Sequence, residues 1–241
     1  MTRTTLHPDA GEIAAEMTAR EFNRVLGMPR HRELDGELAE RAAGARAWYA
    51  AHGAPYVRVY RYGIAEIDAD GVTLAGGRRL AGERLAGHLR RYDAHALAAI
   101  AVSAGAEVDD ASAAAWGDDR PDEGYFLERL GVAVVERLRF RTMLEFCQRS
   151  GQAGETLTPH LSPGCGGWEL AQQHALWSLI FAEGEAAPVA LLESGGLTPK
   201  NAILAVAGIT RMAVDHSPLD ACRSCSLARC GFRRAPYGGP S

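Results

Sequence analysis

The sequence has almost no lysine and no excess of positive charge. Only Lys200 among its 26 basic residues is a lysine, and 30 acidic residues bring the formal net charge to −4. Proteins that bind nucleic acid or anionic membrane surfaces do so largely through clustered positive charge, and this composition supplies no such general attraction. We therefore expect no nucleic-acid partner and no membrane partner.

Long apolar runs are absent as well. No stretch of the sequence approaches the roughly 20 consecutive apolar residues that a membrane-spanning helix needs. The first ten residues include Arg3, His7 and Asp9, and they contain no apolar core of the kind found in secretory leaders. The sequence thus predicts a cytoplasmic protein.

Cysteine is scarce and unevenly placed. Three of the five cysteines, Cys222, Cys225 and Cys230, fall within nine residues of one another. Five cysteines make a thin disulfide framework for this length, so in a reducing compartment the grouping predicts a metal site instead. Both zinc and iron–sulfur clusters accept thiolates at these intervals. The residues alone leave four candidates for a further ligand: Cys165, His216, His160 and Cys147.

What the sequence does contain is enough apolar material for one sizeable core. Hydrophobic residues make up 47% of the chain, and in several segments they recur with the 3.6-residue period of a helix. This spacing predicts helices over residues 8–26, 35–53, 80–89, 121–151 and 169–182.

Other segments have the composition of strands, being rich in β-branched and aromatic residues or short and apolar. They predict strands over residues 56–62, 72–74, 189–192 and 203–208, the last two paired with each other. Residues 94–104 fit either a buried strand or a buried helix, and residues 109–119 are typical of an acidic loop around Trp116. Because these elements do not alternate as regular βαβ units, we expect an α+β fold with a mixed or antiparallel sheet and flanking helices.

Three segments, taken together, resemble one protein family. The first is Leu161-Ser-Pro-Gly164 followed by Gly167-Trp168 and a helix carrying Gln172-Gln173. The other two are Leu192-Glu-Ser-Gly-Gly-Leu-Thr-Pro-Lys-Asn201 and the tail Cys222-x-x-Cys225-x4-Cys230. In this order they resemble the activation (reactivation) domain of cobalamin-dependent methionine synthase, and in particular the short stand-alone members of that family that end in a cysteine cluster.

The resemblance implies a helmet-shaped α+β domain, here residues 1–217, with residues 218–241 forming a cysteine-rich, metal-binding tail packed on it. It also implies a small-molecule ligand, S-adenosylmethionine, whose methyl group is presented to a corrinoid in the cob(II)alamin state. Reductive methylation then returns the corrinoid to its cycle. Because the chain contains no Asp-x-His-x-x-Gly motif, cobalamin would be reached only through a partner corrinoid protein.

The resemblance also implies which residues bind the ligand: His160, Ser162, Pro163, Gly164 and Glu193. Two positions depart from the family's pattern, because His160 and Cys165 stand where that pattern has an arginine and a tyrosine. A histidine lacks the planar fork with which a guanidinium binds a carboxylate. The sequence therefore leaves open what would hold the carboxylate end of the ligand.

The family context favours a [4Fe-4S] cluster over zinc, because reductive reactivation needs an electron at low potential and zinc has no redox chemistry. The implied cluster ligands are Cys222, Cys225 and Cys230, with Cys165 as the fourth. Two other functions stay open: a repurposed iron–sulfur enzyme that acts on another small molecule, and a zinc-stapled binding protein without catalysis.

Overall fold

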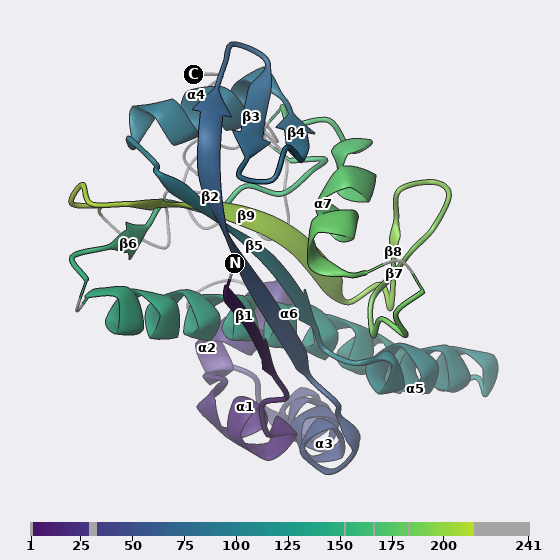
Figure 1. The fold of residues 1–241 in the computed structure, drawn as a ribbon. Coiled ribbons are helices and arrows are strands. Elements are labelled where there is room, and N and C mark those ends of the chain that lie inside the picture. Colours follow the sequence, from purple (N-terminus) through teal and green to yellow (C-terminus); the bar gives the residue numbers. More distant parts are fainter. Residues whose placement is uncertain (1, 29–32, 152, 166, 183, 215–241) are drawn as a thin grey trace.

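The computed structural model describes residues 2–28, 33–151, 153–165, 167–182 and 184–214. Within these residues the chain forms a seven-stranded sheet in the order β4-β3-β2-β5-β9-β6, with β1 paired to β2, and each pairing in it is antiparallel. The sheet strands are β1 (Thr2–Leu6), β2 (Tyr56–Ile67), β3 (Gly71–Leu74), β4 (Arg79–Ala81), β5 (Ala96–Ser103), β6 (Thr156–Leu157) and β9 (Ala202–Thr210). Figure 1 shows that the sheet curls strongly. The expected α+β architecture is confirmed.

Helices cover both faces of this sheet. They are α1 (Ala10–Glu16), α2 (Ala19–Val25), α3 (Gly36–His52), α4 (Glu83–Arg91), α5 (Ala106–Gly117), α6 (Pro121–Gly151) and α7 (Gln172–Ile180). The helices α1, α2, α3 and α6 lie on one face, and α4 and α7 lie on the other (Figure 1). In the part of the chain that the structure describes, none of these helices is long and apolar enough to cross a membrane.

The segment 94–104, which fits a strand or a helix equally well in the sequence, contains the central strand β5. All eight residues of β5 are buried, and their side chains alternate between two hydrophobic clusters. Ala98 and Ile100 belong to the cluster under α1, α3 and α6, whereas Leu97 and Ala99 belong to the cluster under α4 and α7. A strand that is covered on both faces shows no polar alternation, which is why its period was ambiguous.

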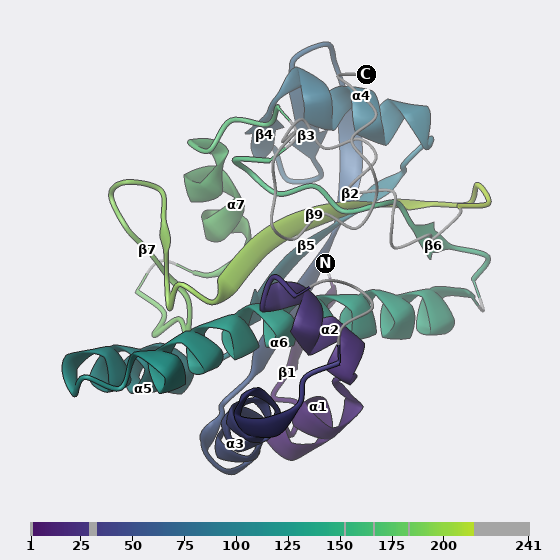
Figure 2. The same ribbon diagram turned by 180° about the vertical axis from the view of Figure 1, so that it is seen from behind.

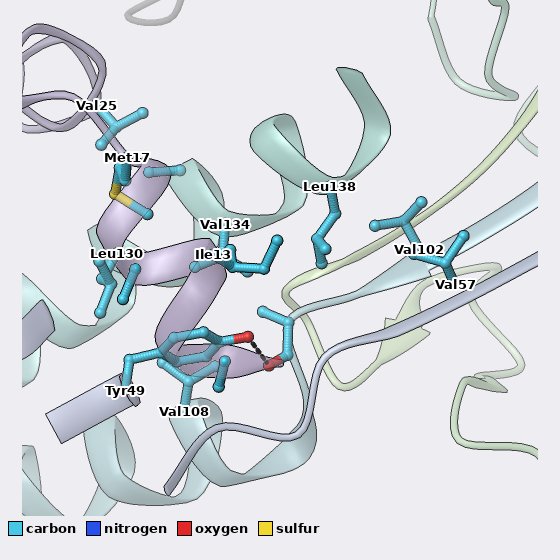
Figure 3. Packing of buried hydrophobic residues seen from close by; sticks show 14 of the residues in the cluster. Ile13, Met17, Val25, Tyr49, Val57, Val102, Val108, Leu130, Val134 and Leu138 are labelled. Atoms are coloured by element: carbon cyan, nitrogen blue, oxygen red, sulfur yellow. Dashed lines mark hydrogen bonds between the residues drawn. The ribbon is translucent and has the colours of Figure 1, made fainter. Parts of the chain in front are cut away.

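The larger cluster fixes α6 and α3 against the sheet. Ile13, Leu130 and Val134 pack together beside Tyr49, and Val57 and Val102 contribute from the sheet (Figure 3). The Tyr49 hydroxyl donates a hydrogen bond of 2.8 Å to the Ala104 carbonyl. The aromatic ring is therefore fully buried without leaving its polar atom unsatisfied.

The N-terminal helix predicted over residues 8–26 is wrong in its extent, because the structure has two helices there. Thr18 separates the two helices as the N-cap of α2. Its hydroxyl accepts a hydrogen bond from the Glu21 backbone amide, and the Glu21 carboxylate accepts one from the Thr18 backbone amide. This capping box satisfies amides that a continuous helix would bond internally, and it lets the chain turn. The strand β1, ahead of these helices, was not predicted.

Two further predictions near the sheet were wrong. Leu80, predicted to lie in a helix over 80–89, lies in β4 opposite Val72. The helix α4 begins only after Gly82, whose φ of 141° is outside the helical range. The predicted acidic loop 109–119 is mostly the helix α5. Its inward positions Val108, Ser112 and Ala115 are buried at helical spacing against α6.

The predicted pairing of 189–192 with 203–208 is also wrong. The first segment contributes β7 (Ala190–Leu191), which pairs with β8 (Leu197–Thr198) in a separate hairpin. The Leu192 amide donates to the Gly196 carbonyl at 2.8 Å, so the chain reverses at once. The strand β9 instead pairs with β5 along eight residues and with β6 at its end.

Candidate functional site

The candidate ligand turn begins as an addition to the outer edge of the sheet. After β6, the Thr158 amide donates to the Gly208 carbonyl at 2.8 Å. Leu161 and Val206 then exchange two backbone hydrogen bonds of 2.8 Å each. The chain therefore follows β9 before it turns away toward α7 (Figure 2).

The turn itself is closed by backbone hydrogen bonds and needs glycine. The Gly164 amide donates to the Trp168 carbonyl at 2.8 Å, and the Cys165 amide donates to the Ser162 carbonyl at 3.1 Å. Gly164 and Gly167 have φ angles of 82° and 83°. Residues with a Cβ seldom adopt this left-handed conformation, so the two glycines explain why the sequence forms a tight turn here.

Trp168 carries the turn across to the opposite edge of the curled sheet. Its indole Nε1 donates to the Ala81 carbonyl at 2.7 Å, and the Ala81 amide donates to Gln172 Oε1 at 2.9 Å. The Trp168 ring is fully buried and passes so close to Gly82 that a Cβ there would lie 2.6 Å from Trp168 Cδ1. The turn thus bridges β9 and β4, at the two sides of the half-barrel.

The two segments that the sequence assigned to one ligand site lie on either side of Leu170. A Cβ at Gly164 would lie 3.1 Å from Leu170 Cδ1, and a Cβ at Gly195 would lie 3.4 Å from Leu170 Cγ. Gly164 is exposed beside Leu170, which is itself 45% exposed, whereas Gly195 is buried against it. Glu193 is exposed on the same reversal as Gly195, between β7 and β8.

Ser162 and Pro163 are buried at the start of the turn. The Ser162 hydroxyl has no hydrogen-bond partner among the described residues. Leaving a buried hydroxyl unsatisfied costs on the order of 1–3 kcal/mol, so such a group is an available contact for a polar ligand atom. Together with the glycine backbone, this hydroxyl fits a ligand that has both apolar and hydrogen-bonding parts.

His160 receives a contact that the sequence did not predict. Arg139, in the middle of α6, places its Nη1 2.8 Å from His160 Nδ1. The two residues are 21 positions apart, and Arg139 lies in a helix with many arginines, so no local signal marks it. The helix α6 thus brings a guanidinium to this histidine.

A second histidine contacts the chain between β6 and the turn, and it comes from the other face of the sheet. His88 on α4 lies with its Nε2 2.9 Å from the Thr158 hydroxyl, which also accepts from the Gly208 amide at 2.8 Å. The hydroxyl donates to the Pro159 carbonyl, 3.1 Å away, so the proton between His88 and Thr158 belongs to the histidine. Burial lowers the pKa of His88 to about 4, which keeps the ring neutral at pH 7.

Glu155 anchors the segment at its beginning. Its carboxylate accepts two hydrogen bonds from Arg61, of 2.6 and 2.9 Å, and lies 2.9 Å from His95 Nε2. The hydrogen bonds from Arg61 are the main cause that holds the pKa of Glu155 down at about 2. Because Arg61 belongs to β2 and His95 immediately precedes β5, this contact ties the segment to the centre of the sheet.

The predicted metal ligands fall in two places. Cys165 is exposed on the turn, whereas Cys222, Cys225 and Cys230 lie outside the described residues. Among the residues that the structure does describe, no three His, Cys, Asp or Glu side chains are grouped as metal ligands. Cys147, another of the candidates for a further ligand, is partly buried on α6 with its Sγ 3.6 Å from the Thr156 hydroxyl.

Two cavities lie away from this turn. The larger, of about 440 Å³, is bordered by residues of α3 and α6, including Glu40, Trp48 and Phe126. The smaller, of about 170 Å³, lies between the end of β1 and α6 and includes Leu6 and Thr142. Neither cavity contains a residue that the sequence singled out for a ligand.

The sequence matches no protein-family model and no curated protein. Its fold, however, is similar to that of the crystal structure of the MetH reactivation domain bound to AdoHcy (S-adenosylhomocysteine). The two superimpose with a TM-score of 0.64, over 86% of this chain and 78% of that chain, at 12% sequence identity. A likeness at this identity shows the fold. The helmet-shaped α+β architecture that the sequence motifs implied is therefore confirmed.

Proposed function

We propose that this protein binds S-adenosylmethionine, or its product S-adenosylhomocysteine, at the turn formed by residues 160–168. The observation that carries the proposal is this turn, which bridges the two edges of a reactivation-domain fold. It presents glycine backbone beside a buried hydroxyl that has no hydrogen-bond partner among the described residues. The similar structure was solved with AdoHcy bound. Shared fold does not fix function, so the proposal depends on the residues of the turn.

Each residue of the proposed site has a role that its chemistry allows. Gly164 lets a ligand approach the backbone closely, with Pro163 fixing the turn before it. The Ser162 hydroxyl and the imidazole of His160 supply hydrogen bonds, and the carboxylate of Glu193 is suited to a ribose hydroxyl or an ammonium group. Leu170 adds an exposed apolar surface between the two segments.

The reaction we propose is the reductive reactivation, or the methylation, of a corrinoid carried by a partner protein. A sulfonium methyl group supplies the methyl cation equivalent and leaves a neutral thioether, while the cobalt must first gain one electron. We propose that this electron comes from a [4Fe-4S] cluster held by Cys222, Cys225 and Cys230 with Cys165 as the fourth ligand. A thiolate on the turn would bring the cluster next to the ligand.

Ser162→Ala tests the ligand site. Because the hydroxyl has no partner among the described residues, its removal should leave the melting temperature unchanged or raise it. The same change should weaken binding of S-adenosylhomocysteine about 5- to 10-fold, the value of one hydrogen bond to a ligand, when measured by calorimetry. Wild-type protein that gives no heat and no thermal shift at millimolar ligand would rule the proposed function out.

A pair of glycine variants separates crowding from backbone strain. Gly164→Ala and Gly154→Ala both place a Cβ at a positive φ, of 82° and 69°. Only the Cβ at position 164 meets a neighbour, Leu170, whereas the one at position 154 meets nothing within 4 Å. We expect both variants to lose stability and Gly164→Ala alone to lose affinity. Equal affinity losses would contradict a site at the turn.

A further inference from the structure

We propose that Arg139 of α6 binds the carboxylate of the ligand, so that the site recognises adenosyl compounds with an amino-acid end. This inference rests on the proposed function. It assigns a partner to the ligand carboxylate, for which the candidate turn supplies none by itself. It makes α6, on the other side of the sheet edge from α4, a part of the binding site.

The direction of the side chain follows from its neighbours on α6. Arg137 contacts Glu21 on α2, and Arg141 contacts Glu16 on α1 at 3.1 Å. Residues two positions apart on a helix point about 200° apart, so Arg139 leaves the opposite side of α6. The contact of its Nη1 with His160 Nδ1, at 2.8 Å, confirms that it points to the candidate turn.

The same contact fixes the hydrogen-bonding state of His160. A guanidinium only donates hydrogen bonds, so His160 Nδ1 must be the unprotonated acceptor. A neutral His160 then carries its proton on Nε2, and protonation of Nδ1 would break the contact and place two cations together. The positive charge of the pair therefore resides on Arg139, and His160 is a hydrogen-bond donor at Nε2.

This division of roles selects a ligand group. The planar guanidinium matches a carboxylate with two parallel N–H donors, which an imidazole cannot offer. Partial burial strengthens such a contact, because the charges are screened less than on an open surface. Arg139 is partly buried. The amino-acid end of S-adenosylmethionine or S-adenosylhomocysteine carries this carboxylate, whereas 5′-methylthioadenosine has the adenosyl thioether without it.

The experiment compares these two thioethers by calorimetry on the full chain. We expect Arg139→Gln to weaken S-adenosylhomocysteine binding about 10-fold or more while 5′-methylthioadenosine binds as it does to the wild type. Arg139→Lys keeps the positive charge but loses the paired N–H donors of the guanidinium. Its affinity for S-adenosylhomocysteine should therefore lie between those of the wild type and Arg139→Gln. Arg149→Gln, at an exposed arginine near the end of the same helix, is the matched control and should change neither affinity.

The outcomes separate this inference from the function on which it rests. Wild-type protein that binds neither thioether overturns the proposed function and the inference with it. Wild-type protein that binds both, with Arg139→Gln weakening both equally or neither, overturns the inference and leaves the ligand site standing. Melting curves of each variant identify a folding defect. If Arg139→Gln has one, the test is whether Arg139→Lys weakens S-adenosylhomocysteine binding more than 5′-methylthioadenosine binding.

Discussion

Among single residues, His88 joins the candidate site to the stability of the fold. It lies partly buried on α4, and its ring is tilted against Tyr92 at 5.0 Å between centroids. Its bond to Thr158 fixes the strand-like segment that leads into the turn. Because the folded protein holds this histidine neutral, the site segment depends on pH in a defined direction.

Lowering the pH should therefore destabilise the protein through His88. Its pKa falls from 6.5 in the unfolded chain to about 4 in the folded protein, chiefly because it is buried. The unfolded state then binds more protons, so stability is complete above pH 6.5 and is lost as the pH falls toward 4. The free energy of unfolding should drop by about 2–3 kcal/mol across this window.

His88→Gln isolates that contribution, because a glutamine amide can still donate to Thr158 but does not titrate. Urea unfolding at several pH values between 7 and 4.5 should show a smaller pH dependence for the variant than for the wild type. Carboxylates such as Glu155 titrate alike in both proteins and cancel in the comparison. Parallel pH profiles would refute the role of His88.

At the scale of elements, the turn is important because it spans the sheet from β9 to β4. Trp168→Phe keeps most of the buried ring but removes the donor to the Ala81 carbonyl. We expect a loss of about 1–3 kcal/mol in stability, since that carbonyl loses its partner. We also expect weaker binding of S-adenosylhomocysteine, because the turn and the start of α7 lose one of their two hydrogen bonds with Ala81.

Trp177→Phe is the matched control for this element. Trp177 lies on α7, and its Nε1 donates to the Val189 carbonyl at 2.8 Å, a contact outside the turn. Its substitution should cost a similar amount of stability, measured by urea unfolding, without changing the affinity measured by calorimetry. If both variants lose affinity in proportion to stability, the turn has no special connection to the ligand.

The elements also show what the sequence could predict and what it could not. The long helix over 121–151 was predicted with its bounds, because its apolar spacing is sustained and Pro121 starts it. The glycines of the turn came from the family resemblance of their segment, and the structure gives Gly164 and Gly167 the positive φ angles that favour glycine. The hairpin of β7 and β8 and the break at Thr18 were missed, since strand partners and caps depend on contacts beyond a local period.

The candidate site also contains residues that the sequence could indicate and residues that it could not. Ser162, Pro163 and Gly164 were candidates because their segment resembles the family's ligand turn, and they lie together at the start of one turn. Arg139, His88 and Glu155 could not, because each reaches the segment from a different element. Long-range contacts of this kind leave no spacing pattern in a single sequence.

On the scale of the whole molecule, one sheet separates two hydrophobic clusters, and the site segment lies at the edge where both layers reach it. Arg139 comes from α6 on one face and His88 comes from α4 on the other. The segment is thereby held from both sides as well as by β9. A site supported in this way keeps its geometry without depending on a flexible loop.

The cysteine-rich tail, residues 218–241, contains three of the four expected cluster ligands. The turn that closes the sheet exposes Cys165, and we expect that thiolate to complete a [4Fe-4S] cluster with Cys222, Cys225 and Cys230. A cysteine thiol loses its proton when it binds a metal, and a fourth ligand from the body would fix the tail to the domain. Protein purified without oxygen should then contain about four iron and four sulfide ions per chain.

Substitutions decide how the cluster is held. Cys225→Ala and Cys165→Ala should each abolish iron and sulfide, measured chemically and by visible absorbance, whereas Cys147→Ala on α6 should retain both. Full iron in Cys165→Ala with unchanged spectra would replace the four-cysteine site by three cysteines and an open iron. Full iron in Cys225→Ala would show that the tail is not the metal site. Zinc in place of iron in the wild type would remove the internal source of electrons, because zinc cannot change its oxidation state, and would leave the metal only the task of fixing the tail.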